Sequence, residues 1–392
     1  MIRLVSYSSQ NIGCGIADYN QHLLAAMAGS IERETVAVTY DRIPIHRLRP
    51  LVELRRRYGK LAASADRHDV VLLQYYDRLW NGTRPIENTF PLFLKHIHKP
   101  MVMVLHEWPK QPPNTARAGS PPVRVAKSLL HWSVRRWEIG GADYSTWVNE
   151  TMFKRMAHIV VMTRELADRL VRVGVPEERI SVEQFPVHRM APPCWSETEV
   201  RERYGLGDRR VLLLLGAAHP RKGYELAIRA MAKLPPDIVL VMVCPTRTEV
   251  TKQQVQVLLD LAKQVGVADR VVHIDFLESP ELASVFAISQ IALSPFTSVT
   301  GSSSVAHFIA GALPILASDL PTLRETRDAG AGMVMFKPGD VDDLRDQVLA
   351  VLANDGLRRQ LAGKSRDYAD HYSFEGLAER MSRIIERIAG AR

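Results

Sequence analysis

Short, almost purely apolar runs alternate along the whole chain with amphipathic segments of helical periodicity. The runs in the first half are 2–7, 35–39, 70–74, 101–106, 159–162 and 180–184, and those in the second are 210–216, 238–244, 271–275, 291–294, 314–317 and 332–335. Continuous apolar runs of this length are typical of parallel strands that are buried on both faces. Their alternation with helices predicts an α/β fold.

The chain is 392 residues long, which exceeds what one ordinary hydrophobic core holds. A proline-containing segment at 187–196 breaks the periodicity between the two sets of strands. We therefore expect two doubly wound, Rossmann-like domains facing a central cleft, over residues 1–190 and 191–368. Residues 369–392 contain a further amphipathic helix. Ligands of such sheets bind at the carboxyl ends of the strands, so the loops after strands are the ones to examine.

Composition is that of a soluble globular protein, with 46% hydrophobic and 24% charged residues. No apolar run approaches the roughly 20 residues of a membrane span, and the N-terminus lacks a signal-peptide pattern. The three cysteines, Cys14, Cys194 and Cys244, are few and widely spaced, which favours neither a disulfide framework nor a zinc site. We expect a cytoplasmic protein.

The net charge of +8 comes from the first half of the chain. Residues 1–195 hold 27 Lys/Arg and 18 Asp/Glu, whereas residues 196–392 hold 24 and 25. Basic residues gather in 47–60 and on a helix-periodic segment at 122–137 that also contains Trp132 and Trp137. The segment 122–137 is either an ordinary solvated helix or a docking site for anionic lipid or a lipid-linked acceptor. The proline-rich stretch 109–122 ahead of it suits a mobile lid. No nucleic-acid-binding module is present.

Three loops carry candidate chemistry. Gly13 and Gly15 follow the first strand and precede a helix. Their loop either lets the backbone approach a phosphate closely or is an ordinary tight turn. His106 ends the fourth strand, where it is either a structural histidine or a substrate contact. Arg221 and Lys222 precede a helix and form a cationic pair suited to a diphosphate.

The fourth loop is rich in glycine and serine. It runs from Ser294 through Thr300, Gly301, Ser302 and Ser303 into a short helix, and a buried strand follows near Pro314. Small residues feeding a helix N-terminus offer unpaired N–H groups and the positive end of the helix dipole. This pattern predicts an anion site.

Taken in order, these motifs resemble the GT-B retaining glycosyltransferases that use nucleotide-sugar donors. The resemblance rests on the runs Cys14–Tyr19, Leu73–Tyr75, Leu105–Glu107, Gly216–Gly223 and Ala312–Asp319. It implies that the last helix crosses back to the N-terminal domain. It also implies sugar transfer from a UDP- or GDP-sugar to a hydroxyl acceptor, a glycan or a lipid-linked precursor, without a metal or other cofactor.

The resemblance also implies roles for the candidate residues. Gly13 and Gly15 would lie near the donor diphosphate, and His106 would contact the donor sugar. Lys222, helped by Arg221, would neutralise the leaving diphosphate. The segment Thr300–Ser303 would hold the sugar or phosphate.

The chain departs from the family pattern at three positions. The family carries a glutamate at each end of a nine-residue window, where this chain has Val299 and His307. Ala217 stands where the family often has an arginine. Either the serine-rich loop and His307 replace the glutamates with hydroxyl and imidazole hydrogen bonds, or the chain is an inactive homologue that acts as a scaffold. Because Lys222, His106 and the glycine loop remain, we favour an active enzyme. A GT-B epimerase would need paired carboxylates that the chain does not display.

Overall fold

The computed structural model describes residues 1–9, 15–27, 29–38, 48–80, 90–109, 147–299 and 301–391. Several expectations concern residues outside these ranges: Gly13, Thr300, Arg47, the basic segment 122–137 and nearly all of the lid segment 109–122. The chain folds into two compact units, one formed by Met1–Glu183 with Phe374–Arg392 and the other by Gln184–Ser373. These boundaries differ by a few residues from those expected from the sequence, which are 1–190 and 191–368.

The first unit is built on a six-stranded parallel sheet in the order β2-β1-β3-β4-β5-β6. Its central strands β3 and β4 are buried along their whole length, in agreement with their continuous apolar sequences. The strands are β1 (Ile2–Ser8), β2 (Ile31–Ala37), β3 (Val70–Tyr75), β4 (Met101–Leu105), β5 (His158–Val161) and β6 (Ile180–Val182).

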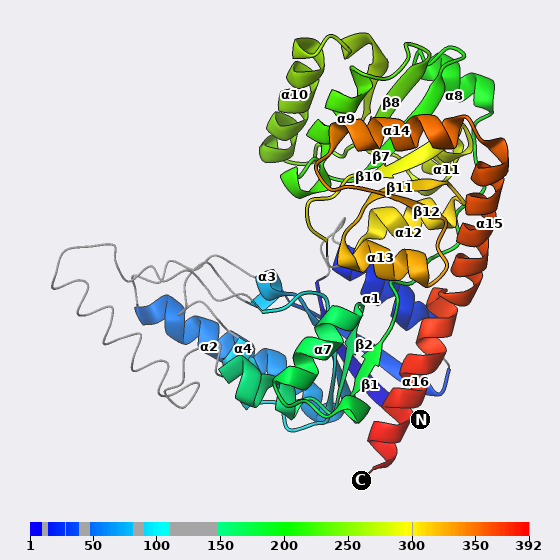
Figure 1. Ribbon diagram of the computed structural model, residues 1–392. Coiled ribbons are helices and arrows are strands. Elements are labelled where there is room, and N and C mark those ends of the chain that lie inside the picture. The colour runs from blue at the N-terminus through cyan, green and yellow to red at the C-terminus, as the bar shows by residue number, and fades with distance from the viewer. Residues whose placement is uncertain are drawn as a thin grey trace. The chain divides into compact units, whose positions relative to one another are not determined.

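Helices cover both faces of this sheet (Figure 1). Alternate strand residues such as Tyr7, Leu73 and Met103 join one core with residues of α2, α4 and α7, and α16 packs on α1 and β3. The last helix thus returns to the unit in which the chain begins. The helices are α1 (Gly15–Ala26), α2 (Leu48–Ala63), α3 (Asp77–Trp80), α4 (Phe90–Lys95), α7 (Arg164–Arg172) and α16 (Phe374–Gly390).

All twelve predicted strands are present, and the two parallel sheets confirm the α/β fold class. The largest error concerns β2, which begins at Ile31 rather than at Thr35. Its sequence, IERETVA, is mostly polar because β2 lies at the edge of the sheet and much of it is exposed. Edge strands lack the continuous apolar signal by which buried strands are recognised.

The second unit contains a six-stranded parallel sheet in the order β12-β11-β10-β7-β8-β9. The strand order reverses between β7 and β10, so the loops after these two strands diverge at a topological switch point, where such sheets bind ligands. The strands are β7 (Arg210–Leu215), β8 (Ile238–Val243), β9 (Val271–Ile274), β10 (Ser289–Ser294), β11 (Ile315–Ser318) and β12 (Met333–Phe336).

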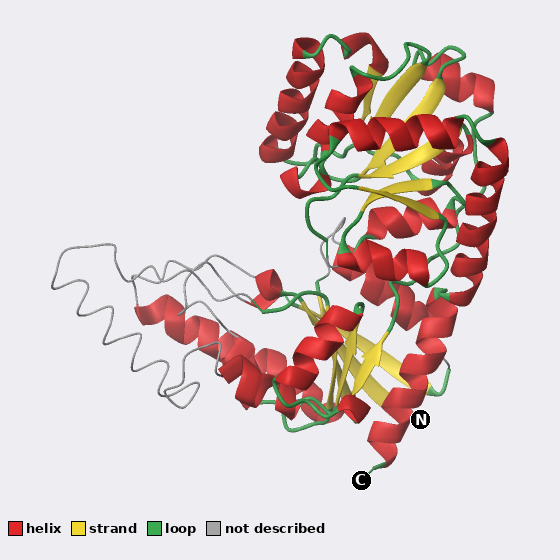
Figure 2. Ribbon diagram, in the orientation of Figure 1, coloured by secondary structure: helices red, strands yellow, loops and turns green. Residues whose placement is uncertain are grey.

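Separate cores lie on the two faces of this sheet, which Figure 2 shows between layers of helices. Residues of α9, α10 and α14 fill one core, and residues of α8, α11, α12, α13 and α15 fill the other. The helices are α8 (Glu197–Arg203), α9 (Tyr224–Met231), α10 (Glu249–Gln264), α11 (Ser279–Ala287), α12 (Ser303–Ala310), α13 (Pro321–Asp328), α14 (Val341–Leu352) and α15 (Asp355–His371).

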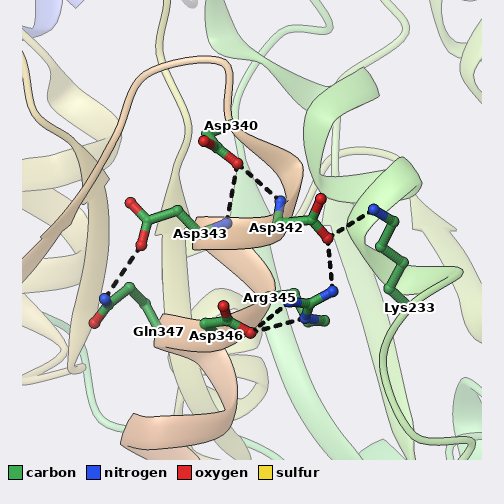
Figure 3. Close-up of polar contacts among 7 residues, drawn as sticks. All are labelled: Lys233, Asp340, Asp342, Asp343, Arg345, Asp346 and Gln347. Atoms are coloured by element: carbon green, nitrogen blue, oxygen red, sulfur yellow. Dashed lines mark hydrogen bonds and ion pairs between the residues drawn. The ribbon is translucent and has the colours of Figure 1, made fainter.

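The acidic start of α14 has a structural role (Figure 3). Asp340 caps the helix by accepting hydrogen bonds from the N–H groups of Asp342 and Asp343, both at 3.1 Å. Asp342 also accepts from Lys233, which follows α9, and from Arg345, each at 2.6 Å. Carboxylates at a helix N-terminus are favoured by the helix dipole. The cluster therefore caps α14 and ties it to the end of α9.

Candidate functional site

The loops after β7 and β10 approach each other so closely that glycine is required between them. Gly223 has φ +69°, and a Cβ atom there would overlap the carbonyl oxygen of Pro295. The N–H of Thr297 donates to the carbonyl of Arg221 at 2.8 Å. A main-chain hydrogen bond and a close backbone contact thus join the two switch-point loops next to Lys222.

Lys222 points into this junction. Its ammonium donates to the carbonyl of Leu215 and to the hydroxyl of Ser304, both at 3.0 Å. Gly216, with φ +105°, lies so close that a Cβ atom would collide with Nζ of Lys222. The pKa of Lys222 is lowered to about 8, mainly by burial and to a smaller extent by the positive charge of neighbouring Arg221. Within the described residues, the hydrogen bonds to Leu215 and Ser304 use two of the three N–H groups of the ammonium.

The start of α12 faces the same ammonium. The hydroxyl of Ser302 caps the helix by accepting from the N–H of Val305 at 3.3 Å, and it lies 2.9 Å from the hydroxyl of Ser304. Ser303 is exposed at the first helical position, and Gly301 precedes the cap. A partly buried cation beside a helix N-terminus is a favourable environment for an anion. The structure therefore brings Lys222 together with the Gly301–Ser303 segment.

Arg221 does not join Lys222 inside the junction. Its side chain is exposed, while its backbone forms the hydrogen bond to Thr297. The two members of the predicted cationic pair therefore occupy different environments. Ser304, which sequence reasoning did not select, contacts the ammonium instead.

His307 is held by two contacts within the second unit. Its Nδ1 lies 2.6 Å from the carbonyl oxygen of Ser303, and its Nε2 lies 3.2 Å from Nε2 of His188. The sequence does not predict His188 as a site residue, because it lies in the proline-containing segment 187–196, which we interpreted only as the break between the two sets of strands. No local sequence signal connects two residues 119 positions apart.

In the first unit, His106 ends a chain of buried polar side chains. Its Nε2 lies 2.8 Å from Oε1 of Gln74, whose amide nitrogen donates to Oδ1 of Asn20 at 3.1 Å. The hydroxyl of Ser6 donates to the same Asn20 oxygen at 2.6 Å. With this amide orientation, Nε2 of His106 carries the proton and Nδ1 is the acceptor. The network thereby selects one tautomer of His106.

Burial lowers the pKa of His106 to about 4. The imidazole is therefore neutral at physiological pH, and the ring of Tyr19 packs against it at 5.2 Å between centroids, nearly perpendicular. This histidine can accept a hydrogen bond through Nδ1 but supplies no positive charge. Gly15, the other predicted residue described in this unit, is the first residue of α1.

The described residues contain neither a metal-binding cluster nor a membrane-spanning helix. Nowhere in the ranges described do three or more His, Cys, Asp or Glu side chains gather in a way that could hold a metal ion. Within the same ranges no helix is long and apolar enough to cross a membrane. On α2, Arg56, Arg57 and Lys60 are exposed.

Comparison with known proteins gives the site its context. Residues 196–368, almost the whole of the second unit, match the family described as glycosyl transferases group 1. This region is therefore similar to group 1 glycosyl transferases. It contains Lys222, Ser302–Ser304 and His307, so the switch-point site lies entirely inside the matched region.

The chain spans less than two thirds of the length of the curated relatives that it matches. A GDP-mannose-dependent alpha-(1-6)-phosphatidylinositol monomannoside mannosyltransferase of Mycolicibacterium smegmatis is 34% identical over 27% of each chain. Alpha-D-kanosaminyltransferase of Streptomyces kanamyceticus is 22% identical over 62% of this chain and 63% of its own. Lipopolysaccharide glucosyltransferase WaaG of Escherichia coli is 26% identical over 54% of each.

Solved structures resemble the whole chain in fold. Anabaena Alr3699/HepE, crystallised with UDP and glucose, matches with a TM-score of 0.69 at 12% identity, over 99% of this chain and 100% of its own. WaaG matches with a TM-score of 0.63 at 16% identity, over 98% and 99%. Sucrose-phosphate synthase of Thermosynechococcus elongatus matches with 0.70 at 14%, over the full length of both. The chain therefore has the GT-B fold.

Proposed function

We propose that this protein transfers a sugar from a nucleoside-diphosphate donor to a hydroxyl acceptor with retention of configuration. The observation that carries this proposal is the Lys222 ammonium, held beside the N-terminus of α12 at the switch point of the region that matches group 1 glycosyl transferases. Transfer breaks the bond between the anomeric carbon and the donor phosphate, which leaves with the electron pair. The acceptor oxygen bonds to the same carbon, and its proton passes to an oxygen of the leaving diphosphate or to solvent.

The step needs a group that stabilises the negative charge that develops on the leaving diphosphate. A preorganised cation and helix N–H groups supply this stabilisation in a partly dry site. Lys222 offers an N–H beyond its bonds to Leu215 and Ser304, and the exposed start of α12 offers backbone N–H groups. These groups make a reaction without a metal chemically reasonable.

Two further roles complete the proposal for the donor. His106, neutral and with Nδ1 as its acceptor, orients a hydroxyl of the donor sugar. Arg221, exposed beside Lys222, adds long-range attraction for the anionic donor. We propose a UDP- or GDP-sugar because GDP-mannose appears in the name of one relative and UDP is bound in one structural neighbour.

For the acceptor we propose a glycan or a lipid-linked precursor. The relatives' names include a phosphatidylinositol monomannoside and a lipopolysaccharide, and the basic residues concentrate in the first 195 positions. We propose a cytoplasmic enzyme that binds peripherally to the anionic inner face of the membrane. Lys and Arg side chains near such a surface contribute about 1 kcal/mol each.

A thermal-shift screen of UDP- and GDP-sugars in the presence of a chelator tests this function. We expect at least one donor to stabilise the wild type and Lys252→Ala, an exposed-lysine control on α10, but not Lys222→Ala. NMR of the product formed with an added acceptor then reports the anomeric configuration. Donor binding without any transfer or donor hydrolysis would favour the scaffold alternative, and absence of binding by the wild type would contradict the proposal.

A further inference from the structure

Two successive carbonyl groups at the end of β7 are held by different side chains. The carbonyl of Leu215 accepts from the ammonium of Lys222 at 3.0 Å, whereas the carbonyl of Gly216 accepts from the hydroxyl of Tyr224 at 2.6 Å. Tyr224 is the first residue of α9 and is buried. Burial raises the pKa of its hydroxyl well above the usual value. The hydroxyl of Tyr224 therefore remains a protonated donor to Gly216.

Gly216 lies directly beside the ammonium of Lys222, although its carbonyl points to Tyr224. A Cβ atom added to Gly216 would collide with Nζ of Lys222. The N–H of Gly216 donates to the carbonyl of Val243 on β8 at 2.9 Å. Gly216 has φ +105°, and the peptide groups of a glycine rotate with little steric resistance. The hydrogen bond from Tyr224 therefore fixes the direction of this carbonyl.

Removal of the Tyr224 hydroxyl would leave the Gly216 carbonyl in need of another donor, because an unpaired buried carbonyl is costly. The ammonium of Lys222 has one N–H beyond its two hydrogen bonds among the described residues. The thiol of Cys244 also lies beside the Tyr224 hydroxyl, but a thiol is a weak donor. Hydrogen bonds from a charged donor are the stronger ones. The freed carbonyl is therefore expected to turn to Lys222.

We infer that Tyr224 is a positioning residue for Lys222, because it holds the Gly216 carbonyl away and so leaves one ammonium N–H for an anionic ligand. The inference rests on the proposed binding of a nucleoside diphosphate by Lys222. Tyr224 does not need to touch the ligand, since it acts through the peptide group of Gly216. It determines how many hydrogen bonds the ammonium can offer.

Calorimetric titration of the full chain with UDP and with GDP, up to millimolar concentrations, tests this role. For whichever nucleotide binds the wild type, Tyr224→Phe should bind about fivefold more weakly, because the Gly216 carbonyl then occupies the N–H. In the Lys222→Ala background the same change should alter affinity less than twofold, since the ammonium is absent. Such coupling is not expected if the hydroxyl of Tyr224 contacts the ligand directly or only stabilises the fold.

Tyr368→Phe is a matched control. It also removes a buried hydroxyl, which donates to Oε1 of Gln184 at 3.4 Å, but Tyr368 belongs to the core on the other face of the sheet. This variant should bind the nucleotide as the wild type does. Melting temperatures show that each variant is folded.

A crystal structure of ligand-free Tyr224→Phe gives an independent measurement. The Gly216 carbonyl oxygen should lie within about 3.2 Å of Nζ of Lys222, whereas in the wild type it accepts from Tyr224. An unmoved carbonyl, unchanged affinity, or an equal loss of affinity with and without Lys222 would overturn the inference alone. Failure of the wild type to bind either nucleotide would overturn the proposed function, and this inference with it.

Discussion

The ammonium of Lys222 lies 3.0 Å from the hydroxyl of Ser304 and so joins the loop after β7 to the first turn of α12. The two residues are 82 positions apart in the sequence. Their contact places a cation at the N-terminus of a helix, and it gives the switch point of the second sheet the character of an anion site.

The first prediction concerns this pair. Lys222→Ala should weaken binding of the nucleoside diphosphate about 10- to 100-fold, as expected for loss of a charge-assisted hydrogen bond. Ser304→Ala should weaken it about fivefold, because the ammonium loses one of its supports. Calorimetry on both single variants and the double variant measures the coupling. Independent, additive effects would show that Ser304 does not act through Lys222.

The second prediction concerns pH. Burial lowers the pKa of Lys222 to about 8, so the free protein loses this cation as the pH rises through that value. Phosphate groups are already fully ionised there. Nucleotide affinity should therefore fall with rising pH above about 8, by up to tenfold for each pH unit. Lys222→Arg keeps its charge, so its affinity should not fall in this range; an equal fall in that variant would assign the titration to another group.

The third prediction concerns the polar network of the first unit. Gln74→Leu should lower the free energy of unfolding by about 1–3 kcal/mol, because Asn20 and His106 each lose a buried hydrogen-bond partner. The chemical denaturation midpoint measures this effect. In the wild type, the pKa of about 4 for His106 predicts no change in its proton NMR signal between pH 5.5 and 8. A titration in that interval would contradict the neutral imidazole.

The fourth prediction concerns the glycine between the two loops. Gly223→Ala places a methyl group against the carbonyl of Pro295 in a left-handed conformation, and it should cost more than about 2 kcal/mol and impair nucleotide binding. Gly266→Ala is a matched control, with φ +75° and no atom within 4 Å of the new Cβ. It should cost only about 1 kcal/mol and leave binding intact. Equal losses in both variants would show that backbone conformation, and not the contact with Pro295, is decisive.

The fifth prediction concerns the membrane. The protein should pellet with phosphatidylcholine vesicles that contain phosphatidylglycerol and remain in solution with pure phosphatidylcholine, and added salt should reverse binding. Replacing the exposed Arg56, Arg57 and Lys60 of α2 by alanine should weaken this binding at least tenfold. Equal binding to both kinds of vesicle would exclude an electrostatic basis.

Local periodicity was enough to predict both sheets. Buried parallel strands are continuous apolar runs, so strands such as β3 and β8 could be predicted almost to their ends. The predicted position of β2 lies too far along the sequence, because an edge strand is largely polar and lacks a continuous apolar run. The sequence also predicted that Lys222 and His106 follow strands. Loops after parallel strands lie at the edge of the sheet where ligands bind, so both residues could be selected as candidates.

The sequence by itself determined the fold class and the loops in which the candidate residues lie. Only the tertiary structure decided what those residues contact: Ser304 for Lys222, Gln74 for His106 and His188 for His307. The physical reason is that strand and helix patterns repeat over a few residues, whereas these hydrogen bonds join segments 32 to 119 positions apart. Which of their atoms meet depends on strand order, loop path and the donor or acceptor state of each nitrogen.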